Sequence, residues 1–94
     1  MNKVKELLFI TVIGKDRKGI VAKVSGLVYE CGLNIEDISQ KIMDGHFVMT
    51  MMVDMGDSKY SLEDIREKLE KLGRELDQSI QIQHENIFKM MHRV

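Results

Sequence analysis

The sequence predicts a small α+β fold with the element order βαββαβ. Two stretches are apolar at successive positions, as in strands buried on both faces, and two others repeat apolar residues every three to four positions, as in amphipathic helices. The pair Asp44-Gly45 marks a hairpin turn between two of the strands. Ninety-four residues in this order favour a ferredoxin-like sandwich, with two helices on one face of a four-stranded antiparallel sheet.

Length, charge and cysteine content narrow the class of protein. We expect one domain over residues 1–94, with a core at 5–84 and a C-terminal helical tail at 85–94. A net charge of −1 leaves no basic surplus for nucleic acid, and no apolar run approaches the roughly 18 residues that span a membrane. The single cysteine, Cys31, excludes an internal disulfide and fits a reducing compartment. Since the N-terminus also lacks a signal-peptide pattern, we expect a cytoplasmic protein.

The first strand leads into the most informative turn of the chain. Residues 5–13 are apolar on both faces, which is typical of a central strand, and Gly14 and Gly19 bracket the turn that follows. Asp16 is placed to cap the next helix by accepting a hydrogen bond from an amide near Gly19. The free amides of the first helical turn then favour an anion such as a carboxylate or phosphate. The alternative is a tight glycine turn in which Asp16 only caps the helix and no ligand binds.

Apolar spacing predicts the first helix and the next two strands. Apolar residues recur along 20–31 in one helical stripe, so Cys31 is expected in the core, and Gly32 fits a left-handed cap at the end of the helix. The polar stretch 34–43 predicts an edge strand with a bulge. Residues 46–54 are apolar on both faces and predict a second central strand.

A second helix and a last strand complete the order. Ser61 and Asp64 resemble a capping box at the start of a helix whose buried stripe reaches Leu76. Residues 79–84 alternate between isoleucine and polar side chains, as in a half-buried strand. Because two helices cover only one face of the sheet, the apolar outer faces of the central strands need another cover. A homodimer, or the tail at 85–94, would supply it.

The turn and the residues after the first helix resemble those of the ACT domain family, and the resemblance covers about residues 5–84. It rests on Gly14-x-Asp16-Arg17-x-Gly19-Ile20-Val21 between strand and helix, and on Gly32-Leu33-Asn34-Ile35. Within that family, the sequence resembles the ACT domains at the start of formyltetrahydrofolate deformylases and those in glycine-cleavage regulators. Its tail resembles that of small stand-alone ACT proteins.

The resemblance implies a regulatory module that dimerises and binds an amino acid or similar small carboxylate between this turn and a partner's strands. Matched position by position, the implied ligand-binding residues are Gly14, Asp16, Arg17, Gly19, Ile20 and Asn34. Arg17 would supply charge, and Asn34 would hydrogen-bond the ligand from the second strand. Lys18 departs from the family, many members of which have proline there, so the turn is expected to be less rigid and more cationic. No catalytic or DNA-binding domain is fused in this sequence, so we expect any regulated protein to be a separate partner.

Other interpretations use the same topology. A protein–protein regulator would work through contacts alone and leave the site empty. An acylphosphatase-like enzyme would use a strand–helix phosphate loop with Arg17 and Asn34 as catalytic groups, although this turn is charged and short. An RNA-binding module needs aromatic residues on its central strands, and Phe47 matches that pattern only weakly. The three histidines show no metal-ligand spacing, so we expect no metal site. The family resemblance implies a non-catalytic protein, and we expect no cofactor.

Overall fold

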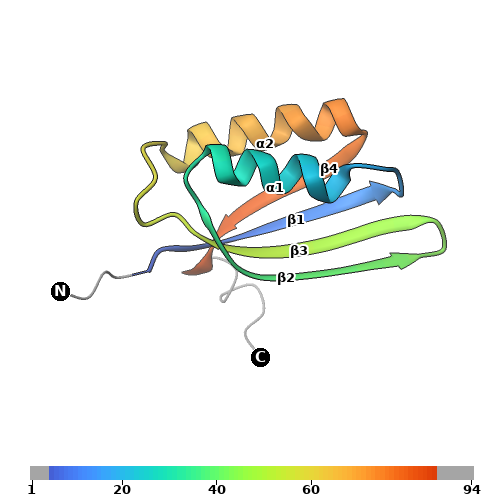
Figure 1. The fold of residues 1–94 in the computed structure, drawn as a ribbon, viewed down its shortest axis with the longest axis horizontal. Coiled ribbons are helices and arrows are strands. Elements are labelled where there is room, and N and C mark those ends of the chain that lie inside the picture. Colours follow the sequence, from blue (N-terminus) through green and yellow to red (C-terminus); the bar gives the residue numbers. More distant parts are fainter. Residues whose placement is uncertain (1–4, 87–94) are drawn as a thin grey trace.

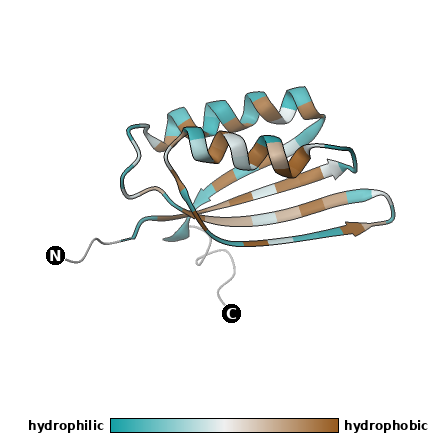
Figure 2. Cartoon of the chain, in the orientation of Figure 1, coloured by the Kyte–Doolittle hydropathy of each residue, from teal (hydrophilic) through white to brown (hydrophobic). Residues whose placement is uncertain are grey.

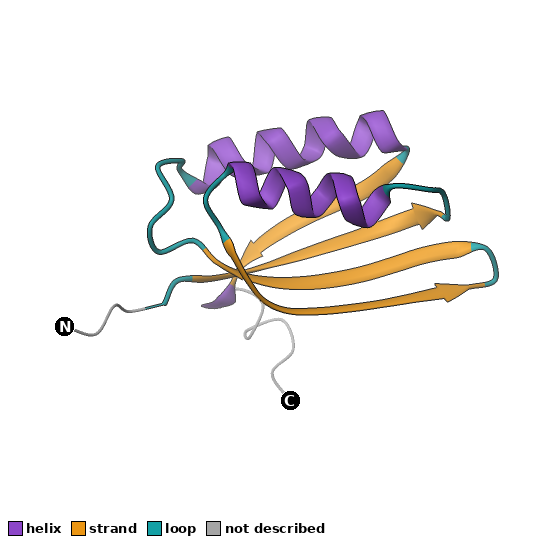
Figure 3. Ribbon diagram, viewed as in Figure 1, coloured by secondary structure: helices purple, strands orange, loops and turns teal. Residues whose placement is uncertain are grey.

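The structure, a computed structural model, describes residues 5–86 and confirms the predicted fold. Antiparallel strands form one sheet in the order β2-β3-β1-β4, and both helices lie over one of its faces (Figures 1 and 3). The two apolar strands are central, as predicted. The elements are β1 (Leu7–Lys15), α1 (Ile20–Glu30), β2 (Asn34–Met43), β3 (His46–Asp54), α2 (Leu62–Leu76) and β4 (Gln78–His84).

The core fills the space between the helices and the sheet. Hydrophobic segments run along β1 and β3 and recur on the helices (Figure 2). Cys31 is buried among them, as the helical stripe predicts, and burial raises the pKa of its thiol. The fully buried large side chains are Leu8, Ile10, Val12, Ile20, Val24, Val28, Met49, Met51, Val53, Ile65 and Leu69.

The two helices begin in different ways. At α2 the predicted capping box is confirmed, because the Asp64 amide donates to Ser61 Oγ at 3.1 Å and the Ser61 amide donates to Asp64 Oδ2 at 3.4 Å. At α1 the predicted cap by Asp16 is wrong. The N-cap is Gly19, with φ of 86°, and no side-chain hydrogen bond caps the helix.

The reason is that β1 ends two residues later than predicted, at Lys15. Gly14 lies inside the strand, paired with Phe47 and Gln78, and does not begin the turn. The backbone N–H of Asp16 donates to the carbonyl of Gly45 at 3.0 Å, which holds Asp16 beside the β2–β3 hairpin, three residues before the N-cap. The turn itself is therefore confined to residues 16–19.

The β2 strand lies at one edge of the sheet, as predicted, with a bulge between Ile35 and Asp37. Ile38 and Ile42 pair with residues of β3 that are buried under the helices, so they share that face. The helices leave them uncovered, and Ile38 is 42% exposed. A ten-residue edge strand with exposed isoleucines is a template for pairing with another strand.

The face of the sheet that the helices leave uncovered exposes less apolar surface than the sequence predicts. Phe9 and Met52 are half-buried, while Ile13 is 47% exposed. The tail at 85–94 was predicted as a helix and as one possible cover for this face; its residues 87–94 lie outside the described residues.

Candidate functional site

The turn at residues 16–19 sits where three connections of the chain meet (Figure 1). Besides the bond from Asp16 to the β2–β3 hairpin, Arg17 Nη1 donates to the carbonyl of Leu76 at 3.2 Å. At the end of β1, Gln78 Nε2 donates to the carbonyl of Lys15 at 2.7 Å. The turn is thus anchored to the hairpin on one side and to the α2–β4 junction on the other.

The start of α1 offers unpaired donors. The first amides of a helix have no acceptor within it, and no side chain of the described residues caps them here. The helix dipole makes this end electropositive, and Lys15, Arg17 and Lys18 are exposed beside it. Ile20 takes part only through its backbone, since its side chain is buried in the core. This arrangement suits the carboxylate of a small ligand.

Gln78 is the residue at this turn that the sequence analysis missed. It is the first residue of β4, it is 8% exposed, and its side chain lies against Gly14. A Cβ atom at Gly14 would lie 2.5 Å from Gln78 Oε1, so glycine is needed here to make room for the chain's own carboxamide. The signal was present: extending the alternation of Ile80 and Ile82 back by two places turns Gln78 inward.

We expect Gly14→Ala to destabilise the chain through Gln78. The added methyl would displace the carboxamide and break its bond to the Lys15 carbonyl, at a cost of about 1 kcal/mol or more in the free energy of unfolding. Urea denaturation of Gly14→Ala, Gln78→Ala and the double variant would measure the coupling. In the Gln78→Ala background the cost of Gly14→Ala should largely vanish; strictly additive costs would contradict this explanation.

Asn34 lies at the opposite end of the sheet. It pairs with Asp54 at the end of β3, whereas the turn follows residues that pair with Phe47 and His46. Seven strand residues separate these positions, roughly 24 Å at the usual rise. A single chain therefore does not bring Asn34 to the turn, although Gly14, Asp16, Arg17, Gly19 and Ile20 do gather there.

Asn34 belongs instead to a polar network at the start of β2. Its Nδ2 donates to Glu36, and the Lys5 ammonium also donates to that carboxylate. The hydrogen bond from Lys5, followed by that from Asn34, holds the pKa of Glu36 below its ordinary value. Because Arg17 and Asn34 lie at opposite ends of the sheet, one chain does not form the catalytic pair that an acylphosphatase-like enzyme would need.

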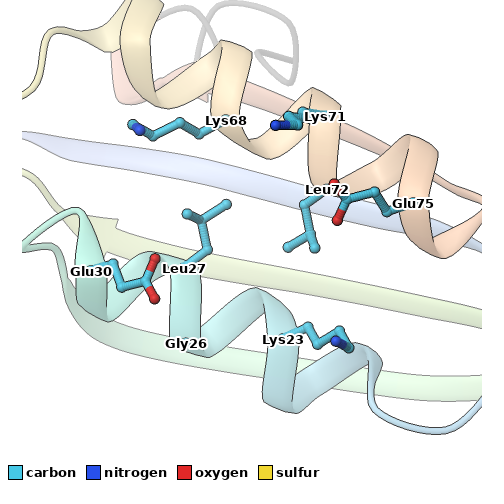
Figure 4. Close-up of a pocket in the computed structure, with 8 residues that line it drawn as sticks. All are labelled: Lys23, Gly26, Leu27, Glu30, Lys68, Lys71, Leu72 and Glu75. Atoms are coloured by element: carbon cyan, nitrogen blue, oxygen red, sulfur yellow. The ribbon is translucent and has the colours of Figure 1, made fainter.

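A groove of about 450 Å³ lies elsewhere, between the two helices (Figure 4). Leu27 and Leu72 point toward one another across it, and Gly26 leaves it open. Lysines and glutamates line its rim with both signs of charge, and no buried polar atom of the described residues is aimed into it. The turn is the stronger candidate because it combines helix amides that no side chain caps with more basic than acidic side chains, Lys15, Arg17 and Lys18 against Asp16. The groove is lined by Lys23, Gly26, Leu27, Glu30, Lys68, Lys71, Leu72 and Glu75.

Two further features were searched for in the described part of the chain. No three histidine, cysteine or carboxylate side chains of residues 5–86 come together as they would to hold a metal ion. Over the same residues, neither helix combines the length and apolar character needed to cross a membrane.

The element order and the sheet define a small ferredoxin-like α+β module with two helices on one face. The family model for the ACT domain matches residues 6–83. The chain belongs to the ACT domain family, whose members are regulatory and typically bind amino acids. The family that the sequence resembles is thereby confirmed.

Relatives and solved structures support this membership. The chain is 48% identical to a UPF0237 protein of Methanocaldococcus jannaschii over 85 residues, which are 90% of this chain and 94% of that one. An ACT domain protein from Streptococcus pneumoniae is 43% identical, with a TM-score of 0.80 over 92% of this chain and 97% of that one. A structure described as a glycine cleavage system transcriptional repressor is 27% identical, with a TM-score of 0.76. That match covers 86% of this chain and 46% of the other protein.

Proposed function

We propose that this chain is a non-catalytic regulatory module that binds an amino acid or a similar small carboxylate at residues 16–19. The observation that carries the proposal is the start of α1, where Gly19 leaves the first amides without a side-chain cap. The ligand's carboxylate would accept hydrogen bonds from these amides. Arg17 uses one N–H group on the Leu76 carbonyl, which leaves other donors of its exposed guanidinium for the same anion.

A homodimer would bring Asn34 to this site. If two β2 strands pair antiparallel about a two-fold axis, the start of the partner's strand lies beside the end of this one, near Met43. Met43 pairs with His46, and His46 with Lys15, so this end of β2 lies at the same end of the sheet as the turn, with β3 between them. The partner's Asn34 would then approach the ligand, its Nδ2 held by Glu36 and its Oδ1 free to accept from an amino group. The same pairing would cover Ile38 and Ile42.

Calorimetric titration of the full chain tests the proposal. We expect one or more proteinogenic amino acids, with serine and glycine tried first, to bind with a dissociation constant between micromolar and millimolar, roughly 4–8 kcal/mol. At about 100 times that constant, the ligand should add ~2.7 kcal/mol to the free energy of unfolding. Nucleotides and an acyl phosphate serve as controls; turnover of the acyl phosphate would favour an enzyme.

A pair of glycine variants separates binding from stability. Gly19→Ala and Gly32→Ala each force a side chain into positive φ, at 86° and 74°, with no backbone atom closer than 3.9 Å to the new methyl. Both should lose similar stability, but only Gly19→Ala alters the start of α1 and should weaken binding. Equal binding by the two variants would place the ligand elsewhere.

A regulator that acts by protein contacts alone is the second candidate. The observation that favours it is the carboxamide of Gln78, which occupies the room that Gly14 leaves. On this view the glycines shape the turn and the module works by docking on a separate protein. Absence of heat and of thermal stabilisation across all the amino acids would favour it.

A further inference from the structure

We propose that Gln78 Oε1 accepts a hydrogen bond from the amino group of the ligand, so that the site recognises a carboxylate with a donor beside it. This inference rests on the proposed function and adds a residue to it. Gln78 comes from β4, on the other side of β1 from the strands that a partner would reach.

The oxygen is an unused acceptor in an otherwise satisfied core. Gln78 is the one buried polar residue among residues 5–86, and Nε2 of its carboxamide is paired with the Lys15 carbonyl at 2.7 Å. That bond also identifies which atom is nitrogen, because an oxygen in that place would face another acceptor. Oε1 is buried and accepts no hydrogen bond from the described part of the chain. Most buried acceptors in folded proteins are hydrogen-bonded, so a buried acceptor without a partner calls for an explanation.

The unused acceptor lies beside a residue just before the turn in the sequence, and the unused donors lie just after it. Oε1 lies against Gly14, at the base of the turn, and the uncapped amides of α1 begin at its other end. A bare anion satisfies only the amides. An amino acid carries an anion and a donor on neighbouring carbons, so it complements both sets of groups. The ligand class that fits is therefore an α-amino acid, in preference to the carboxylic acid that lacks the amino group.

Access to Oε1 requires a movement of the turn. The oxygen is closed off from solvent in this structure, so an amino group reaches it only after a neighbouring segment moves. We assign that movement to residues 16–19, which follow Gly14 and Lys15 directly in the sequence. The bond from Arg17 to the Leu76 carbonyl is the contact that this movement breaks. Arg17 is exposed, so its guanidinium is free to turn toward the bound carboxylate.

Paired ligands and two variants of Gln78 test the inference. Calorimetry compares glycine with acetate and L-serine with 3-hydroxypropanoate, and extends to the same pairing for any other amino acid that binds. The measured quantity is the affinity for the amino acid divided by the affinity for the acid that lacks the amino group. Gln78→Met removes the acceptor and Gln78→Glu keeps one, and both alter the bond to Lys15. We expect the ratio to fall about tenfold in Gln78→Met and to be retained in Gln78→Glu.

The possible results are distinct. If the two variants change the ratio alike, or neither changes it, Gln78 acts only by supporting Lys15 and the inference is overturned. If the wild-type chain binds the amino acid and its deaminated partner equally, the acceptor is unused and the inference is overturned while the proposed function stands. If the wild-type chain binds no amino acid at all, the proposed function fails, and the inference with it.

Discussion

Gly73→Ala is expected to lower the free energy of unfolding by about 1–3 kcal/mol, the usual cost of overpacking a core. Gly73 is buried in α2 where the helix crosses β4. A Cβ atom there would lie 2.7 Å from the backbone carbonyl oxygen of Gln78 and 3.1 Å from Cγ1 of Ile80. A strand backbone cannot rotate away as a side chain does, so α2 must shift off the sheet. Because Leu76 and Gln78 anchor the turn, this shift also reaches the proposed site.

Gly26→Ala is the matched control. Gly26 is also a helix-interior glycine, but no atom outside its own helix lies within 4 Å of a Cβ atom placed there. Alanine should therefore stabilise α1 by about 0.5–1 kcal/mol through backbone entropy alone. Thermal melts should separate the two variants by several degrees, at about 4–8 °C per kcal/mol for a chain of this size. Equal shifts for the two variants would show that α2 and β4 do not pack as closely as described.

Ile38→Lys is expected to convert the proposed homodimer into monomers. Ile38 lies near the centre of β2, where the two-fold axis of a β2–β2 pairing would pass. A lysine there would place two like charges beside each other in a closing interface. The substitution occurs twice in a two-fold dimer. If each lysine costs about 2 kcal/mol of binding free energy, the dimer dissociation constant should rise roughly a thousandfold. Sedimentation should then show the mass of one 10.9 kDa chain, and amino acid binding should weaken because the partner's Asn34 is lost.

Ile13→Lys separates this interface from the other candidate surface. Ile13 has nearly the same exposure as Ile38, 47% against 42%, but it lies on β1 and faces the outer side of the sheet. The variant should remain dimeric if the strands pair edge to edge. A monomer from Ile13→Lys together with a dimer from Ile38→Lys would show that the sheets pack face to face instead. A wild-type monomer at micromolar concentration would remove both arrangements.

The sequence alone determined the elements and their order, because periodicity is a local property. The pattern of apolar residues identified both central strands. The observed bounds of β2 and β3 are those predicted from the sequence, 34–43 and 46–54. The Asp44-Gly45 hairpin and the capping box at Ser61 were equally predictable, since each depends on side chains only a few residues apart. The family was indicated by other local motifs, at Gly14–Val21 and Gly32–Ile35.

Only the tertiary structure decided what surrounds the turn. Asp16 was expected to cap α1, but its backbone bond to Gly45 comes from a hairpin almost thirty residues away in sequence. Gly14 was assigned to ligand approach, yet it makes room for Gln78, 64 positions further along. Asn34 was grouped with the turn, whereas strand register places it at the far end of the sheet. Local sequence does not encode such contacts, because they depend on which strands pair and in what register.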